Sequence, residues 1–297
     1  MRRYVCRSRI GGRTVTESIR RHQVWLFFGL TLILGWFPWY TGIGGIFFPA
    51  PLIAALVITW LADGADGQRL ITARMTRWRV EPRWYAFVLL VPVAISLAAI
   101  GLHILAGGTA PQFPIFRDNP AEVLLVFIAF LIPWQSSAFF EEVGFRGYAL
   151  SHLQQRWGPL AGTLLLGAFF GAWLLPEFHQ SGTAQASMGG VGFYPWFIVT
   201  EMAWSVLMTW AYNRTGNSAL VAGYLFHAVF NSWTLLLLTD ATLGEDSLPP
   251  FDTRLLTINA LVLVLAAIGV VAATKGRLGY QSTGNVDEVV RAPATKS

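Results

Sequence analysis

Two adjacent carboxylates, Glu141 and Glu142, follow an apolar run and precede Arg146. Residues four apart share one face of a helix, so Glu142 and Arg146 are predicted to form an ion pair. Glu141 is rotated by about 100° from its neighbour and has no partner on its own helix. An unpaired carboxylate in apolar surroundings can accept a proton from water, which makes Glu141 a candidate general base. The alternative is that both acids only mark the end of the apolar run.

A histidine and an asparagine lie one helical turn apart in a later apolar run. Their spacing places His227 and Asn231 on one face, where they could hold a metal, orient a water molecule or stabilise an oxyanion. A hydrogen-bonded pair between two helices uses the same geometry, so that interpretation also stays open. Glu201 lies in the middle of the preceding run, where a carboxyl group must be protonated or paired. A structural partner and a part in catalysis are both open for Glu201.

The segments that must position these residues are apolar. Of the 297 residues, 54% are hydrophobic and only 12% are charged, which excludes a soluble domain. Apolar runs long enough to cross a hydrocarbon core occupy residues 24–62, 84–106, 123–140, 159–176, 192–212, 218–239 and 255–274. The first run is long enough for two crossings, with a turn at residues 41–45. The sequence therefore predicts an all-α integral membrane protein, a polytopic bundle of about eight transmembrane helices in the lipid bilayer.

The positive charges indicate how the chain is oriented. The net charge is +5, and arginines are concentrated before the first span and in residues 69–83, after the second. The positive-inside rule places both segments and both termini in the cytoplasm, so the basic charge does not point to a nucleic acid partner. We expect a basic cytoplasmic N-terminal arm (1–23), a membrane domain (24–278) and a polar cytoplasmic tail (279–297). The oligomeric state stays open.

In this order, the two motifs resemble those of the CPBP intramembrane protease family, also called Abi or CAAX-protease-and-bacteriocin-processing proteins, which includes the type II CAAX prenyl endopeptidases. The family's Glu-Glu-x-x-x-Arg motif is matched at residues 141–146, and its His-x-x-x-Asn motif at residues 227–231. The resemblance covers about residues 121–238, the predicted core.

The resemblance implies an intramembrane endopeptidase. Glu141 would activate a water molecule, His227 and Asn231 would position it or stabilise the oxyanion, and Glu142 with Arg146 would support them. The substrate would be a membrane-associated peptide or protein. The implied location is the plasma membrane of a prokaryote, with the active site facing the cytoplasmic side.

One position departs from the family pattern. Between the two motifs the family has Phe-x-x-x-His, whereas this chain has Phe170 followed by Leu174. Leucine neither binds a metal nor takes up a proton, and His179 is the nearest substitute along the chain. Two options follow, a divalent metal such as zinc bound by Glu141 and His227, or no metal at all. The loss of a histidine at Leu174 favours the second option.

Two other classes of function compete with the protease. A pseudoprotease would keep the fold as a membrane scaffold or binding protein, which Leu174 favours and the intact Glu141 and His227 oppose. A small transporter would use Glu201 and Glu141 as coupling acids, but the sequence lacks the inverted repeat expected of one. The protease requires that Glu141 and His227 face one polar cavity inside the bundle.

Overall fold

The computed structural model describes residues 8–132, 137–241 and 249–281, and within these ranges it contains helices and no strands. The α-helices are α1 (Ser8–Tyr40), α2 (Ala50–Thr76), α3 (Pro82–Leu105), α4 (Pro114–Asp118), α5 (Ala121–Leu131), α6 (Ser137–Gly144), α7 (Leu150–Trp157), α8 (Pro159–Trp173), α9 (Ala184–Ser187), α10 (Tyr194–Arg214), α11 (Phe226–Leu238) and α12 (Thr253–Thr274). Two π-helical turns, η1 (Phe145–Ala149) and η4 (Leu220–Leu225), and two 3-10 turns, η2 (Leu175–Phe178) and η3 (Gly190–Gly192), complete the elements. The all-α fold is confirmed.

The predicted spans correspond to eight helical elements. Among the described residues, five helices are long and apolar enough to cross a membrane: α1 from Val15, α2, α3, η4 with α11, and α12. The apolar helices α5 and α8 are shorter, and α10 has 21 residues. The turn predicted at residues 41–45 lies between α1 and α2 as expected. The protein is therefore an integral membrane helix bundle.

The basic N-terminal arm is helical for most of its length. Residues 1–7 of this arm and residues 282–297 of the predicted tail lie outside the described residues. From Ser8 onward the arm is part of α1, so α1 begins well before the apolar run. One reason is that the Nε of Arg20 donates a hydrogen bond of 2.8 Å to the carbonyl of Ala62 and lies 3.2 Å from Asp63. The arm is thus attached to α2.

The fourth predicted span is broken, which corrects the expected place of Glu141. Ile132 has extended backbone angles (φ −89°, ψ 114°), as expected for a residue that precedes a proline, so α5 ends at Leu131. A new helix, α6, begins at Ser137 and continues through η1 and α7 to Trp157. Glu141 therefore lies near the start of a helix rather than at the end of a span.

The helix from α6 to α7 is buried, although its polar sequence predicts a helix at the cytoplasmic face. Several of its polar groups have partners inside the protein. For example, Arg74 of α2 donates hydrogen bonds of 2.9 Å to the carbonyl of Gly147 and to the hydroxyl of Ser151. These hydrogen bonds attach α2 to the buried face of this helix.

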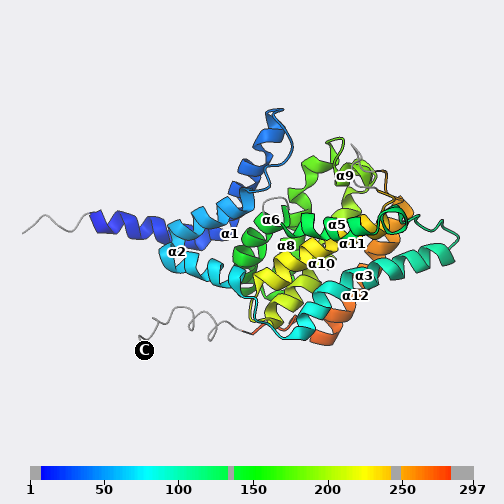
Figure 1. Cartoon of the computed structure of the whole chain (residues 1–297). Coiled ribbons are helices and arrows are strands. Elements are labelled where there is room, and N and C mark those ends of the chain that lie inside the picture. Colours follow the sequence, from blue (N-terminus) through cyan, green and yellow to red (C-terminus); the bar gives the residue numbers. More distant parts are fainter. Residues whose placement is uncertain (1–7, 133–136, 242–248, 282–297) are drawn as a thin grey trace, which may run out of the picture.

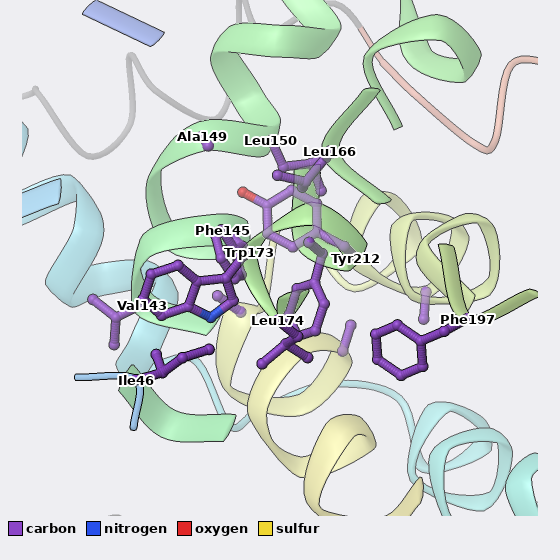
Figure 2. Close-up of a cluster of buried hydrophobic side chains, with 14 of the residues drawn as sticks. Ile46, Val143, Phe145, Ala149, Leu150, Leu166, Trp173, Leu174, Phe197 and Tyr212 are labelled. Atoms are coloured by element: carbon purple, nitrogen blue, oxygen red, sulfur yellow. The ribbon is translucent and has the colours of Figure 1, made fainter. Parts of the chain in front are cut away.

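The bundle places α8, α10 and α11 at its centre, with α1 and α2 on one side and α3 and α12 on the other (Figure 1). α10 packs against α8 and α12, α11 packs against α3 and α5, and α2 packs against α6. Figure 2 shows the buried apolar cluster where these parts meet, with Trp173 and Leu174 between Val143 and Phe197. The end of α8 therefore lies next to the helix that carries Glu141.

Candidate active site

Glu142 is the centre of a buried charge network. Its Oε1 accepts a hydrogen bond of 2.8 Å from Nη1 of Arg146 and lies 3.1 Å from Nδ1 of His227. Nη2 of Arg146 donates a hydrogen bond of 2.8 Å to the hydroxyl of Ser205. Glu142 is 0% exposed and Arg146 is 2% exposed, so little water screens this pair. The predicted ion pair is confirmed, and it also joins α6 and η1 to α10 and α11.

The network fixes the imidazole of His227. An ionised carboxylate only accepts hydrogen bonds, so we assign the proton to Nδ1, which faces Glu142. The Nε2 atom is then the acceptor that remains for a water molecule or substrate. His227 also packs edge-on against the ring of Phe170, with ring centroids 5.6 Å apart. The ring thus has one orientation before any substrate binds.

A π-helical turn lies at each side of the network. Arg146 lies in η1, and η4 directly precedes α11 and His227. Gly223 of η4 lies against the carboxylate: a Cβ at this position would be 3.0 Å from Oε2 of Glu142 and 3.4 Å from Cβ of Arg146. The 3.0 Å distance to Oε2 is shorter than most contacts of a real Cβ, so the absence of a side chain at residue 223 lets η4 lie close to α6. π turns of this kind are frequent at functional sites.

Glu141 points away from this network, as its rotation on the helix predicts. Its Oε1 accepts a hydrogen bond of 3.0 Å from the indole Nε1 of Trp173, at the end of α8. The side chain is 1% exposed, and the indole is fully buried. One carboxylate oxygen is thus held in place by α8, while the side chain lines a cavity.

The cavity brings the predicted site residues together. It has a volume of about 310 Å³, and Glu141, His227 and Asn231 all line it. Phenylalanine side chains form much of the remaining wall, among them Phe170 and Phe197. A carboxylate, an imidazole and an amide in one apolar cavity can bind a water molecule and a peptide carbonyl side by side. Glu141 and His227 thus face one cavity, as the protease prediction requires, but its wall is mostly apolar rather than polar.

Leu174 also lines this cavity, at the position where the resemblance implies a histidine. It is 5% exposed and packs in the apolar cluster beside Trp173 (Figure 2). His179 lies elsewhere: it is exposed, its ring is 6.0 Å from that of Trp39, and it is not among the residues that line the cavity. The structure thus does not place His179 as a substitute for the missing histidine.

Sequence reasoning missed one residue of the site, Trp173, and left the role of another, Glu201, open. Trp173 carried no signal, because a tryptophan near the end of an apolar run is usually a membrane-interface anchor. Glu201 stood out as an acid in the middle of a span, and the sequence left its role open. It lines the same cavity as Glu141 and His227.

The donor set does not fit a metal ion. Within the described residues, no three histidine, cysteine, aspartate or glutamate side chains form a group that could hold one. Catalytic zinc is commonly held by three protein ligands, and Leu174 supplies none where the family has a histidine. One oxygen of Glu141 is already bonded to Trp173, and Nδ1 of His227 faces Glu142. We therefore derive no step through a metal.

Comparisons with known proteins agree with the motifs. The family model of the type II CAAX prenyl endopeptidase Rce1-like proteins matches residues 119–233, which include every site residue predicted from the two motifs. The chain is also similar to CAAX prenyl protease 2 of Methanococcus maripaludis, with 24% identity over 262 residues, or 82% of this chain and 92% of that protein. These matches confirm the resemblance to the CPBP family and its type II CAAX prenyl endopeptidases. The matched family is a family of membrane proteases.

Proposed function

We propose that this chain is an intramembrane endopeptidase of the CPBP type that uses a water molecule activated by Glu141. The observation that carries the proposal is that Glu141 and His227 line one cavity, on two different helices. Glu141 takes a proton from the water as the oxygen attacks the peptide carbonyl. The mostly apolar lining lowers the polarity around the reacting groups, which strengthens the electrostatic interactions inside the cavity.

The other site residues have supporting parts in this mechanism. His227 binds the attacking water through Nε2, since its Nδ1 faces Glu142. Asn231 lies one turn further along α11 in the cavity lining, where its amide can donate a hydrogen bond to the oxyanion. Glu142 and Arg146 hold the imidazole and do not touch the substrate. No metal takes part, because the donor set above does not fit one.

The proposed substrate is a membrane-associated peptide or protein in a prokaryotic plasma membrane. The cytoplasmic side of the active site stays a prediction, because Phe48, Gln185 and Phe251 of the cavity lining lie in connections that the positive-inside pattern places on the opposite side. The names of the matched family and of the relative make a prenylated C-terminal CAAX peptide the first substrate to try. The phenylalanine-rich wall of the cavity is compatible with an apolar ligand.

The test uses the full-length protein in liposomes with a farnesylated CAAX peptide whose cleavage separates a fluorophore from a quencher. We expect Glu141→Gln and His227→Ala to lower kcat by at least 10²-fold, because each removes a group that acts on the water. His179→Ala is the matched control, since this histidine is exposed and outside the cavity. Wild-type turnover in both site variants, with thermal unfolding unchanged, would refute the proposal.

A catalytically inactive scaffold is the second candidate, and one observation favours it: Leu174 fills the place of the family's histidine in the cavity wall. Leu174→His separates the two candidates. A protease that works with an incomplete site should gain activity from the histidine. A scaffold should show no turnover with either residue and should still bind the prenylated peptide.

A further inference from the structure

We propose that Glu201 is a second catalytic acid that protonates the amine leaving group, a role that rests on the proposed function. Glu201 lies on α10, whereas Glu141 and His227 lie on α6 and α11. All three side chains line the same cavity. A pair of carboxyl groups at one site divides acid and base chemistry between them when their surroundings differ.

The side chain of Glu201 is buried without a fixed partner. It is 8% exposed, and among the described residues its carboxyl group has no hydrogen-bond partner. Buried carboxyl groups with a purely structural role are normally hydrogen-bonded, because an unpaired one destabilises the fold. The groups close enough to interact with it electrostatically are His227, Arg146, Glu141 and Glu142, which make up the site. Its free oxygens are therefore available to the contents of the cavity.

The fold holds the backbone of Glu201 against α8. Gly167 and Gly171 lie one turn apart on α8, and both contact α10. A Cβ on Gly167 would be 2.8 Å from the carbonyl oxygen of Glu201, and one on Gly171 would be 3.0 Å from Cα of Ile198. Such pairs of small residues let two membrane helices approach closely. The position of Glu201 is thus set by rigid packing between two helices.

Glu201 also compensates for the histidine that Leu174 replaces in this cavity. The resemblance implies a second histidine in this cavity, and leucine has no group that could move a proton. Both residues line the cavity: Leu174 directly follows α8, and Glu201 lies on α10. Glu201 therefore adds a third proton-carrying group to a cavity that would otherwise have only Glu141 and His227.

The step balances as a peptide hydrolysis. Glu141 removes a proton from water while the water oxygen forms a bond to the carbonyl carbon. As the C–N bond breaks, the electron pair stays on nitrogen, which takes the proton of the protonated Glu201. One water is consumed, and an acid and an amine are formed. The proton on Glu141 then passes through water to Glu201 and resets both acids.

A leaving-group experiment tests this role. With the peptide substrate, we expect Glu201→Gln to lower kcat by about 10²-fold with little change in KM, which is the range for loss of a general acid. With a 4-nitrophenyl ester of the same sequence, the leaving group needs no proton, so Glu201→Gln should react at nearly the wild-type rate. Glu141→Gln should fail on both substrates.

Thr209→Val is the control, because Thr209 is also buried on α10 but does not line the cavity. Equal losses of Glu201→Gln on peptide and ester, or no loss on either, would overturn the role of Glu201 alone. Failure of the proposed function would be different, since the wild-type protein would then cleave neither substrate.

Discussion

The buried charge network predicts that the variant Glu142→Leu is much less stable than the wild type. In the wild type, the Glu142 carboxylate accepts hydrogen bonds from Arg146 at 2.8 Å and from His227 at 3.1 Å, and it is 0% exposed. Leucine would leave the guanidinium of Arg146, which is 2% exposed, without its counter-charge. Breaking a buried pair by removing one partner costs about 3–5 kcal/mol. We therefore expect the free energy of unfolding to fall by that amount.

The double variant Glu142→Leu/Arg146→Met separates charge from packing. Replacing both members of a buried ion pair by apolar residues is often neutral or stabilising. The hydroxyl of Ser205 and Nδ1 of His227 would still lose their partners, at about 1 kcal/mol each. The double variant should therefore unfold within about 2 kcal/mol of the wild type and be more stable than the single variant. Both variants should lack proteolytic activity, because the imidazole is no longer held.

The measurement is reversible unfolding in mixed micelles as the fraction of denaturing detergent increases, followed by tryptophan fluorescence. The matched control is Asp118→Asn, which removes an ion pair of the same length, 2.8 Å to Arg117, whose side chains are 60% and 51% exposed. Solvent screens this pair, so no measurable change is expected. The reasoning fails if Glu142→Leu loses less than about 1 kcal/mol, or if the double variant is no more stable than the single one.

Two further predictions concern the surroundings of the site. Gly223→Ala places a Cβ 3.0 Å from Oε2 of Glu142, so it should lower the activity and should also lower the free energy of unfolding by about 1–3 kcal/mol. The control is Gly101→Ala, where a Cβ meets open space and the change should be neutral or stabilising. Equal effects of the two variants on the free energy of unfolding would contradict the packing argument. Burial raises the pKa of the Glu177 carboxyl, and a 3.4 Å hydrogen bond from the Ile46 amide only partly opposes this shift. The protonated carboxyl therefore stabilises the folded state at low pH. This stabilisation is lost as the pH rises through the raised pKa of the folded state. Thermal unfolding from pH 4 to 8 should therefore show that Glu177→Gln is more stable than wild type at the upper end and less dependent on pH, and a decrease in stability there would refute the sign.

Features that depend on spacing along one helix were predictable from the sequence. The ion pair of Glu142 with Arg146 follows from their separation of four residues, and the structure has it at 2.8 Å. The different directions of Glu141 and Glu142 follow from the rotation between neighbouring residues. The apolar runs likewise predicted the main helices apart from the fourth span, which is broken, because a segment that crosses a hydrocarbon core must be apolar over about this length.

Features that depend on contacts between helices were not predictable. The break at Ile132 is a local effect of the following proline, but the sequence did not show that Glu141 then lies deep in the bundle rather than at its surface. The contact of His227 with Glu142 lies beside the close approach at Gly223, and nothing in the spacing of either motif indicates it. Trp173 binds Glu141 across 32 positions of the sequence, and a tryptophan at a helix end reads as an interface anchor.

Glu141 and Glu142 give different evidence on the choice between a protease and a scaffold. A scaffold would need Glu142, because this carboxylate neutralises Arg146 and joins three parts of the bundle. It would not need a carboxylate at Glu141, since a glutamine could accept the same hydrogen bond from Trp173 without burying an ionisable group. The Glu141 carboxyl is 1% exposed, lines an apolar cavity and has hydrogen bonds with Trp173 and Ser137, so burial of this ionisable group still opposes folding, a cost that the proposed proton transfer would account for. Glu141→Gln should therefore raise stability while abolishing cleavage, a combination that a purely structural Glu141 would not give.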